Sequence, residues 1–345
     1  MMMLAEDLLS LFVALELAAI ASYILVILAW KKQSAEGAIK YLLFGAFASA
    51  MMLYGISWLY GLSGSIDLKL LSWKFSLGLM QYAAIFMMLS GLLMKISAVP
   101  YHIWTPDAYQ IAPTPVVVFL ATASKVAGIV AILKLVRAYE PIFPDVTQIL
   151  AVIATASILL GNLVAFWQKN FKRMLAYSSV ANAGYLLIGS INHSFQDILF
   201  FFLLVYIVAN FLIFSILEYY EQKYAYINVE DFSGIGKMQA IISLTLLVGL
   251  VALAGLPPTA GFTAKLLIFS ALWEQFQANK QSFLLVWLLV GLFNTVVGLF
   301  YYLKAPYFAF FKEAKKPLHE PLPTSILLGA VLLSVLLIGL FVKHF

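Results

Sequence analysis

Long apolar runs follow one another along almost the whole chain and are separated by short polar stretches. A transmembrane helix needs ~20 mostly apolar residues to cross ~30 Å of hydrocarbon, and many of these runs reach that length. The pattern therefore predicts an all-α polytopic membrane protein, with residues 1–345 forming a single membrane domain. We place about ten transmembrane segments near residues 8–30, 39–62, 76–98, 114–137, 147–168, 172–190, 197–220, 238–272, 282–311 and 324–342.

Two of these segments contain signals that break a helix. Segment 238–272 has 35 residues, and a straight helix of that length would extend for ~50 Å, well beyond the bilayer core. Its middle reads Gly-Leu-Pro-Pro-Thr-Ala-Gly at 255–261, where proline removes backbone donors and clashes with the preceding turn. Segment 76–98 runs into a second proline-rich stretch, 99–115, which predicts a second broken helix.

Broken helices at membrane depth favour a transport function. Irregular backbone survives there only where protein or a water-filled cavity satisfies its polar groups. Two interrupted helices at corresponding places in two halves are typical of transporters with inverted repeats. We therefore expect a first, incomplete repeat at 8–137, a second repeat at 147–311 and a terminal helix at 324–342. The first repeat lacks the helix that would correspond to 147–168.

Composition supports this interpretation and excludes several kinds of site. Hydrophobic residues make up 63% of the chain and charged residues 11%, against ~25% charged in soluble domains, so the chain is neither soluble nor disordered. The chain has no cysteine, which rules out disulfides, cysteine-ligated iron–sulfur clusters and thiolate zinc sites. Its histidines have no metal-ligand spacing, so we expect no cofactor or metal in this chain; they are His102, His193, His319 and His344.

The distribution of basic residues predicts the orientation in the membrane, because Lys and Arg concentrate on the cytoplasmic side. The richer set of loops contains Lys31, Lys32, Lys40, Lys169, Lys172, Arg173, Lys223, Lys237, Lys312, Lys315 and Lys316. The opposite set contains Lys69, Lys74, Lys134, Arg137, Lys280 and Lys343. With an even number of helices, both termini are then expected on the non-cytoplasmic side. The first residues lack the basic region of a signal peptide.

Four ionisable residues are the candidate functional groups inside the membrane. Glu16 and Lys125 lie in the middle of their segments, Lys95 closes the run before one break, and Lys265 lies one turn beyond the other. A charge in mid-helix costs ~2.5–3.5 kcal/mol, so such residues persist where something offsets that cost. Alternatives remain open: Lys95 and Lys265 could reach the interface from helix ends, and Glu16 could belong to an ion pair that only locks packing.

These residue types suit proton movement. A nearby carboxylate stabilises the charged form of a lysine in a low-dielectric environment, so separating Glu16 from a lysine would favour release of a proton. A row of such lysines, joined by water and hydroxyl groups, could pass protons along the membrane and across it. His102 is a candidate for the same relay because histidine titrates near neutral pH, or it could satisfy backbone groups freed at the break.

The remaining polar and aromatic residues of the segments carry weaker predictions. We expect interhelical hydrogen bonds or contacts to channel water from Asn162, Tyr177, Ser178, Ser179, Asn182, Asn210, Asn294 and Thr295. We expect positions in an interfacial aromatic belt for Trp58, Trp73, Trp104, Trp167 and Trp273. Lys134 and Lys304 lie near helix ends and are expected to reach the interface.

Three separated motifs give the chain a family resemblance. They are Val-Pro-Tyr-His-Ile-Trp-Thr-Pro-Asp-Ala-Tyr at 99–109 with Ala-Pro-Thr-Pro at 112–115, Asn-Phe-Lys-Arg-Met-Leu-Ala-Tyr-Ser-Ser at 170–179 with Gly-Tyr at 184–185, and Asp-Phe-Ser-Gly at 231–234 with Leu-Ala-Gly-Leu-Pro-Pro-Thr-Ala-Gly-Phe at 253–262. In this order they resemble subunit N of NADH:quinone oxidoreductase (respiratory complex I), an antiporter-like membrane subunit called subunit 2 in mitochondria. The resemblance covers nearly the whole chain.

The resemblance implies roles for the candidate residues. Glu16 matches the family's membrane glutamate, Lys95 its partner lysine, Lys125 the central relay lysine, and Lys265 the lysine of the second broken helix near the proton exit. The related subunit M has glutamate at that last position, and subunit L carries a long C-terminal lateral helix, so subunit N is favoured.

The resemblance also implies the surroundings of the chain. NADH, flavin, iron–sulfur clusters and quinone would lie in partner subunits. The partners would be the antiporter-like M and L types, the small K and J types and the lipid bilayer, with no nucleic acid. The membrane would be the inner (cell) membrane of a bacterium or archaeon, or the mitochondrial inner membrane.

One departure and two alternatives stay open. Bacterial members have fourteen helices, and the helices missing here are N-terminal, which leaves one wall of the first half-channel unaccounted for. The start could lie upstream, or the chain could be a split or reduced member. The alternatives to a complex I subunit are a subunit of a multi-subunit cation/proton antiporter or membrane-bound hydrogenase complex, and a non-conducting structural spacer.

Overall fold

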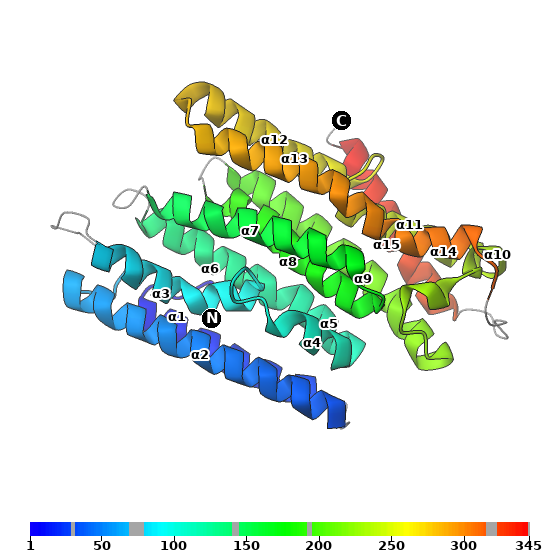
Figure 1. Cartoon of the computed structure of the whole chain (residues 1–345), viewed down its shortest axis with the longest axis horizontal. Helices are drawn as coiled ribbons and strands as arrows, with labels where there is room; N and C mark the ends of the chain where they lie inside the picture. Colours follow the sequence, from blue (N-terminus) through cyan, green and yellow to red (C-terminus); the bar gives the residue numbers. More distant parts are fainter. Residues whose placement is uncertain (29–31, 69–78, 140–144, 192–194, 315–322, 344–345) are drawn as a thin grey trace. The chain divides into compact units, whose positions relative to one another are not determined.

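The computed structural model describes residues 1–28, 32–68, 79–139, 145–191, 195–314 and 323–343, and its regular elements are helices (Figure 1). Two isolated bridges, Asp7–Asp67 and Asn170–Asn228, are the strand-like pairings within these ranges. The helices are α1 (Leu8–Ile27), α2 (Lys32–Ser63), α3 (Leu79–Ile96), α4 (Trp104–Ile111), α5 (Thr114–Ala121), α6 (Ala123–Tyr139), α7 (Asp145–Trp167), α8 (Phe171–Ser190), α9 (Gln196–Tyr224), η2 (Val229–Phe232), α10 (Ile235–Met238), α11 (Ala240–Ala254), α12 (Ala260–Asn279), α13 (Ser282–Tyr302), α14 (Lys304–Phe311) and α15 (Thr324–Lys343).

The all-α prediction is confirmed, and each predicted membrane segment coincides with one helix or with two consecutive helices. Six helical stretches of the described chain are long and apolar enough to cross a membrane, and three shorter apolar helices accompany them. The six stretches are Leu8–Ile27, Ala35–Ser63, Thr114–Ala138, Val146–Trp167, Gln196–Tyr224 and Ser282–Phe311. The chain is an integral membrane protein.

Both predicted helix breaks are present. Helix α11 ends at Ala254, and Gly255 adopts a left-handed backbone (φ 82°) before α12 begins at Ala260. Helix α3 ends at Ile96, and α4 begins only at Trp104. Residues 97–103 therefore form the break predicted at the end of segment 76–98.

A third interruption was not predicted. Segment 114–137 is divided at Thr122 into α5 and α6, with Thr122 at φ −113° and ψ −84°. The Thr122 N–H keeps its helical bond to the Val118 carbonyl at 3.0 Å, and its hydroxyl donates to the same carbonyl at 2.6 Å, a bond of the kind that often bends helices. Segment 282–311 is likewise divided at Leu303 into α13 and α14.

The described residues divide into two compact units. The first comprises Met1–Ile158 and Ser179–Gln196, and the second Leu159–Ser178 and Asp197–Phe345, so α7 and α8 contribute residues to both. The repeat boundaries expected from the sequence stay a prediction.

Close helix packing in the first unit depends on two glycines. A Cβ added to Gly55 of α2 would lie 2.4 Å from the Met88 nitrogen of α3. A Cβ added to Gly128 of α6 would lie 2.6 Å from Cγ2 of Ile96 in α3. Small residues allow membrane helices to approach at backbone distance, and here they hold α2 and α6 against α3.

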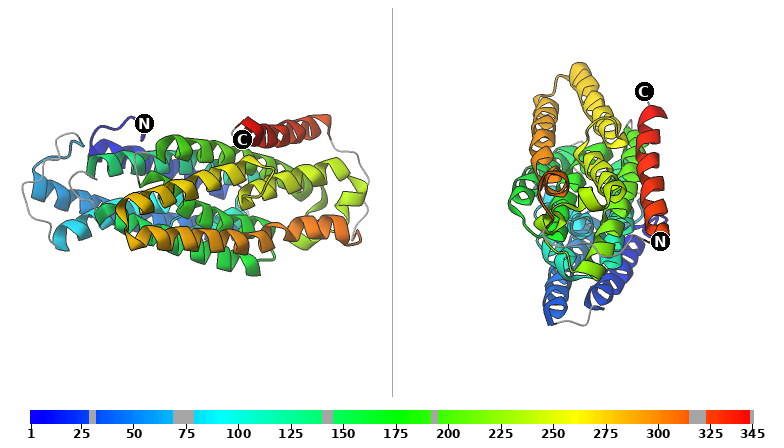
Figure 2. Two further views of the ribbon diagram at one scale, coloured as in Figure 1. Left: turned by 90° about the horizontal axis from the view of Figure 1, so that it is seen from above. Right: turned by 90° about the vertical axis from the view of Figure 1, so that its right-hand side faces the viewer.

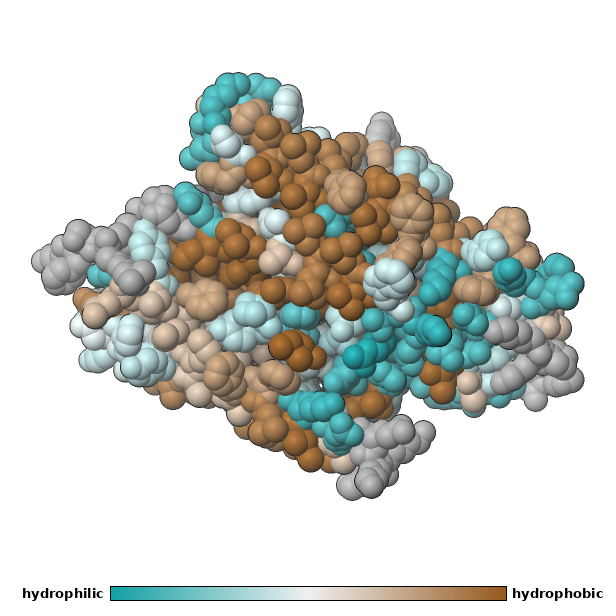
Figure 3. Space-filling view, in the orientation of Figure 1, coloured by the Kyte–Doolittle hydropathy of each residue, from teal (hydrophilic) through white to brown (hydrophobic). Residues whose placement is uncertain are grey.

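The second unit presents a broad apolar surface. Helix α15 packs against α11 and α12 within this unit (Figure 2). Apolar side chains gather over α12 and α13 on the face drawn in Figure 3. Exposed apolar residues follow one side of α13 and include Val286, Leu289, Phe293, Val296 and Phe300, as expected of a helix that faces lipid.

Candidate functional site

Lys95 lies in the last turn of α3, directly before the break, and its side chain is buried. Its Nζ atom has no hydrogen-bond partner among the described residues. The ammonium therefore does not reach the surface of the chain, which argues against the interfacial interpretation. A buried ammonium without a partner is costly, so this position calls for a functional explanation.

Glu16, in the middle of α1, is half-buried and is the carboxylate that acts electrostatically on Lys95. It accepts a hydrogen bond from the hydroxyl of Ser49 in α2. No direct ion pair joins Glu16 to Lys95 in the described part of the chain. Glu16 therefore acts on Lys95 without forming an ion pair with it, contrary to a purely structural ion pair.

Lys125 lies at the start of α6 and is completely buried. Its Nζ donates to the backbone carbonyl of Ser179 in α8 at 2.5 Å. The hydroxyl of the same Ser179 lies 3.4 Å from the hydroxyl of Tyr109 in α4. The central lysine thus contacts one end of a buried polar connection to the half-helix beyond the first break.

Lys95 and Lys125 belong to two helices in direct contact. Gly128 lies one turn after Lys125 on α6, and a Cβ added there would lie 3.7 Å from the Cβ of Lys95. The structure therefore places Lys95 against α6, the helix of Lys125, and Glu16 belongs to the same unit.

Other polar atoms near the two lysines are buried without a hydrogen-bond partner in the described chain. They are the hydroxyls of Ser97 and Thr105 and Nδ1 of His102 at the break between α3 and α4, and the hydroxyl of Ser124 next to Lys125 in α6. The side chain of His102 is half-buried. Buried polar groups of this kind commonly bind internal water. The surroundings of Lys95 and Lys125 therefore suit proton transfer through hydroxyls and water.

Lys265 lies in the second unit, in the second turn of α12, and is buried. Its Nζ donates to the carbonyls of Leu253 and Ala254 at 3.0 and 2.9 Å. These are among the last carbonyls of α11, which lack partners within their own helix. The ammonium points back into the break and does not extend to the surface of the chain, so the alternative of an interfacial lysine is disfavoured.

One aromatic prediction is wrong. Trp104 is buried and is not part of an interfacial belt, because its ring stacks on Tyr41 at 4.1 Å and its Nε1 donates to the Met94 carbonyl at 3.1 Å. It fastens the start of α4 to the end of α3 across the break. Trp167 and Trp273 are exposed, as a belt requires, and Trp73 lies outside the described residues.

The polar residues of the second unit form interhelical hydrogen bonds, as predicted for Asn162, Ser178 and Asn294. The amide of Asn162 lies 3.5 Å from Asn294 and accepts from Tyr301 at 2.9 Å. The hydroxyls of Ser178 and Tyr302 lie 2.5 Å apart. Asn210 and Thr295 instead bond to carbonyls of their own helices.

The second motif and the Asp-Phe-Ser-Gly stretch meet in space and have a structural role. Phe171 donates its N–H to the Ile227 carbonyl at 3.0 Å, and its ring lies 5.2 Å from that of Phe232. Beside this contact, Lys172 forms an ion pair with Glu221 at 2.5 Å. These contacts fasten the start of α8 to the loop that precedes α10.

The sequence did not single out Ser49 or Tyr109 as site residues. Ser49 is a small polar residue inside the apolar run 39–62, and Tyr109 lies within the first motif, so both had a weak signal. Ser49 is identified by its contact with Glu16, and Tyr109 by its contact with Ser179. Both contacts join residues that are far apart along the chain.

No metal centre is found in the described residues, where no three His, Cys, Asp or Glu side chains group as ligands. His193, His319 and His344 lie outside the described residues.

The fold and the site define an all-helical membrane protein in which buried lysines accompany interrupted helices. The model of the NADH:quinone oxidoreductase/Mrp antiporter transmembrane family matches residues 5–293, and the chain belongs to this family. Subunit N of the NADH-quinone oxidoreductase of Chlorobium chlorochromatii is 35% identical over an alignment 361 residues long, gaps included, and the alignment covers 98% of this chain and 69% of that subunit.

Two solved structures share the fold. A chain of respiratory complex I from Thermus thermophilus, determined with bound aureothin, superimposes with a TM-score of 0.82 at 34% identity, covering 98% of this chain and 73% of that one. A chain of an archaeal respiratory membrane complex, the membrane-bound sulfane sulfur reductase, gives a TM-score of 0.88 at 27% identity over 98% of this chain and 69% of that one.

Proposed function

We propose that this chain is a proton-translocating membrane-arm subunit of an NADH:quinone oxidoreductase of the complex I type. Protons move through Glu16, Lys95, Lys125 and Lys265, coupled to quinone reduction elsewhere in the complex. The observation that carries the proposal is the buried ammonium of Lys95, which has no hydrogen-bond partner and is influenced by a carboxylate that does not touch it.

The lysines differ in a way that suits a relay. Lys95 has no partner, whereas Lys125 and Lys265 donate to backbone carbonyls, which are neutral acceptors that remain in place when a proton leaves. A small movement of Glu16 relative to Lys95 changes the stability of the lysine's charged form, because charges interact strongly in a low-dielectric interior. Separation favours proton transfer away from Lys95, and approach favours recapture.

His102 and the hydroxyls beside it complete the proposed path in the first unit. The partnerless atoms of Ser97, Thr105, Ser124 and His102 would bind the water that joins Lys95 to Lys125. Lys265 serves the second unit, close to the proton exit.

The proposal extends to the assembly. Partner subunits of the M, L, K and J types would adjoin the chain. NADH, flavin, iron–sulfur clusters and quinone would bind in other subunits. The lysine-rich loops would face the cytoplasm or the mitochondrial matrix, and both termini the other side.

A second candidate function follows from the breadth of the family, whose description includes the Mrp antiporter, and from the likeness to a chain of a sulfane sulfur reductase. In that case the same lysines would be driven by an ion gradient or by another redox module.

Mass spectrometry of the complex purified through this chain distinguishes the candidates. Subunits that oxidise NADH and reduce quinone should copurify with it. Copurification of antiporter subunits alone, or of a different redox module, would contradict the proposal. The same spectrum reads the N-terminus of the mature chain.

A further inference from the structure

The two predicted helix breaks have the same local construction. Each starts with a residue in the left-handed region, Ser97 at φ 64° in the first unit and Gly255 at φ 82° in the second. The N–H group of the following residue donates to a carbonyl five positions earlier, at 2.8 Å for Ala98 and 3.2 Å for Leu256, which closes the preceding helix. A proline comes three positions after the left-handed residue in both. Positions counted from that residue can therefore be compared between the breaks.

The comparison separates what a break requires from what the first break has in addition. Eight positions after the left-handed residue, both breaks have a threonine, Thr105 or Thr263, whose buried hydroxyl has no hydrogen-bond partner in the described chain. Five and twelve positions after it, the first break has His102 and Tyr109, where the second has alanine and leucine. A break of this construction therefore forms without histidine or tyrosine, and its fold does not explain these two residues.

Tyr109 belongs to a polar face of α4. Thr105 and Tyr109 are four residues apart in this helix, a spacing that puts them on one face, and the Thr105 N–H donates to the His102 carbonyl at 3.0 Å. Asp107 lies two positions from each of them and so does not share their face. It pairs instead with Lys40 of α2 at 3.4 Å. One side of α4 is thus fastened to α2, and the other presents hydroxyl groups.

Tyr109 joins this face to the central lysine. Its side chain is completely buried, and its hydroxyl lies 3.4 Å from the hydroxyl of Ser179 in α8. The backbone carbonyl of the same Ser179 accepts a hydrogen bond from Lys125. An ammonium has three N–H groups and this carbonyl occupies one, so others remain for the Ser179 hydroxyl or for a water beside it.

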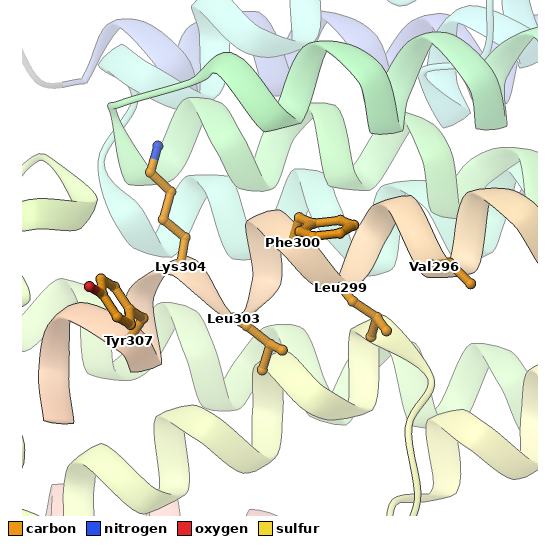
Figure 4. Close-up of a pocket in the computed structure, with 6 residues that line it drawn as sticks. All are labelled: Val296, Leu299, Phe300, Leu303, Lys304 and Tyr307. Atoms are coloured by element: carbon orange, nitrogen blue, oxygen red, sulfur yellow. The ribbon is translucent and has the colours of Figure 1, made fainter. Parts of the chain in front are cut away.

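A lysine bonded to a carbonyl is not by itself a relay group. Lys304, at the start of α14 in the second unit, donates to the Gln168 carbonyl at 3.1 Å, and its ammonium points away from Leu299 and Leu303 (Figure 4). The groove of about 440 Å³ beside it is lined almost entirely by apolar side chains. What distinguishes Lys125 is the pair of hydroxyls next to its acceptor.

We propose that Tyr109 is a further proton-relay residue, whose hydroxyl and that of Ser179 link Lys125 to water bound at Thr105 and His102. This inference rests on the proposed function. Each hydroxyl accepts a proton on its oxygen and releases its own to the next group, so neither keeps a charge. The lysine loses the proton that the water gains, and reversal of the hydrogen bonds restores both hydroxyls.

Tyr109→Phe and Ser179→Ala each remove one hydroxyl and leave the rest of the site in place. The phenylalanine keeps the ring beside Trp104, and the alanine keeps the carbonyl that binds Lys125. In the assembled complex in sealed vesicles, either variant should lower the rate of proton pumping by roughly tenfold or more. The rate should also become more sensitive to replacement of H2O by D2O, since proton transfer then limits it. The double variant should lose no more than either single variant, because the hydroxyls act in series.

Tyr41→Phe is the matched control. The buried Tyr41 hydroxyl lies 3.0 Å from that of Ser22 in the same unit, and the phenylalanine keeps the ring that stacks on Trp104. This variant loses an equivalent buried hydrogen bond and should pump as the wild type does. An equal defect in Tyr41→Phe, or additive losses in the double variant, would overturn the inference.

Lys125→Ala separates this inference from the proposed function. Impaired pumping by Lys125→Ala together with normal pumping by Tyr109→Phe would overturn the role of Tyr109 alone. Normal pumping by Lys125→Ala would contradict the proposed function, and the inference with it.

Discussion

The ammonium of Lys265 reaches back across the break in its own membrane segment and donates to the Ala254 carbonyl at 2.9 Å. The last carbonyls of a helix have no partner within it and carry the negative end of the helix dipole, so a cation stabilises them. The lysine and the interrupted backbone therefore depend on each other, and a change in one should be measurable in the other.

Gly255→Ala should disturb both. Gly255 has φ 82°, where a Cβ costs roughly 1–2 kcal/mol, and that Cβ would lie 2.6 Å from Cδ of Lys265. We expect a lower melting temperature of the purified chain and reduced proton pumping. Gly339→Ala in α15 is the control, because a Cβ there meets nothing within 4 Å and alanine favours a helix. Equal melting temperatures of the two variants would contradict this account of the break.

Lys265→Met should destabilise the chain as well as impair pumping, because it leaves two buried carbonyls without their donor. The expected cost is about 1–3 kcal/mol in the free energy of unfolding for each unsatisfied group. Thermal melting measures it. A variant that pumps poorly but melts as the wild type does would show that the carbonyl contacts contribute nothing to stability.

Gly128→Ala tests whether the spacing of α3 and α6 matters to proton transfer. The added methyl would overlap Cγ2 of Ile96, and overpacking of this kind costs about 1–3 kcal/mol. We expect assembly with slower pumping, since Lys95 and Lys125 move apart. The double variant Gly128→Ala/Ile96→Ala removes the overlapping atom and should recover the rate. Failure of that rescue would separate activity from helix spacing.

Glu16→Gln and Glu16→Asp separate charge from shape. The glutamine keeps the length of the side chain and an acceptor for Ser49 but removes the charge that acts on Lys95. Quinone reductase activity of the assembled complex should fall more in Glu16→Gln than in Glu16→Asp. If the two behaved alike, the charge at this position would have no role.

Much of the fold could be predicted from the sequence, because membrane helices are long, apolar and locally determined. The breaks after Ile96 and Ala254 followed from proline and glycine, whose backbone effects are local. The break at Thr122 did not, since threonine is common within helices and only the backbone angles of Thr122 (φ −113°, ψ −84°) reveal the interruption.

The site was predicted residue by residue but not in its contacts. Mid-segment charges are conspicuous in an apolar chain, so Glu16 and Lys125 were visible in the sequence alone. The acceptors of Lys265 are backbone carbonyls, which every residue has, so the sequence could not identify them. The interhelical contact at Gly128 depends on how α3 and α6 pack, which the sequence does not show either. Trp104 was wrongly predicted to lie in the interfacial belt, because tryptophan near the end of an apolar run is typical of an interface. Here it is buried and joins α4 to the end of α3 through its bond to the Met94 carbonyl.

Coupled pumping by Lys125→Ala in the fully assembled complex is the most direct test of the central claim. The complex would be reconstituted in sealed vesicles, and proton uptake would be measured against NADH oxidation, with the exposed Lys223→Ala as the control. Loss of a side chain that transfers protons should lower the rate of pumping by roughly tenfold or more, while the control pumps as the wild type does. Normal pumping by an assembled Lys125→Ala complex would contradict the relay.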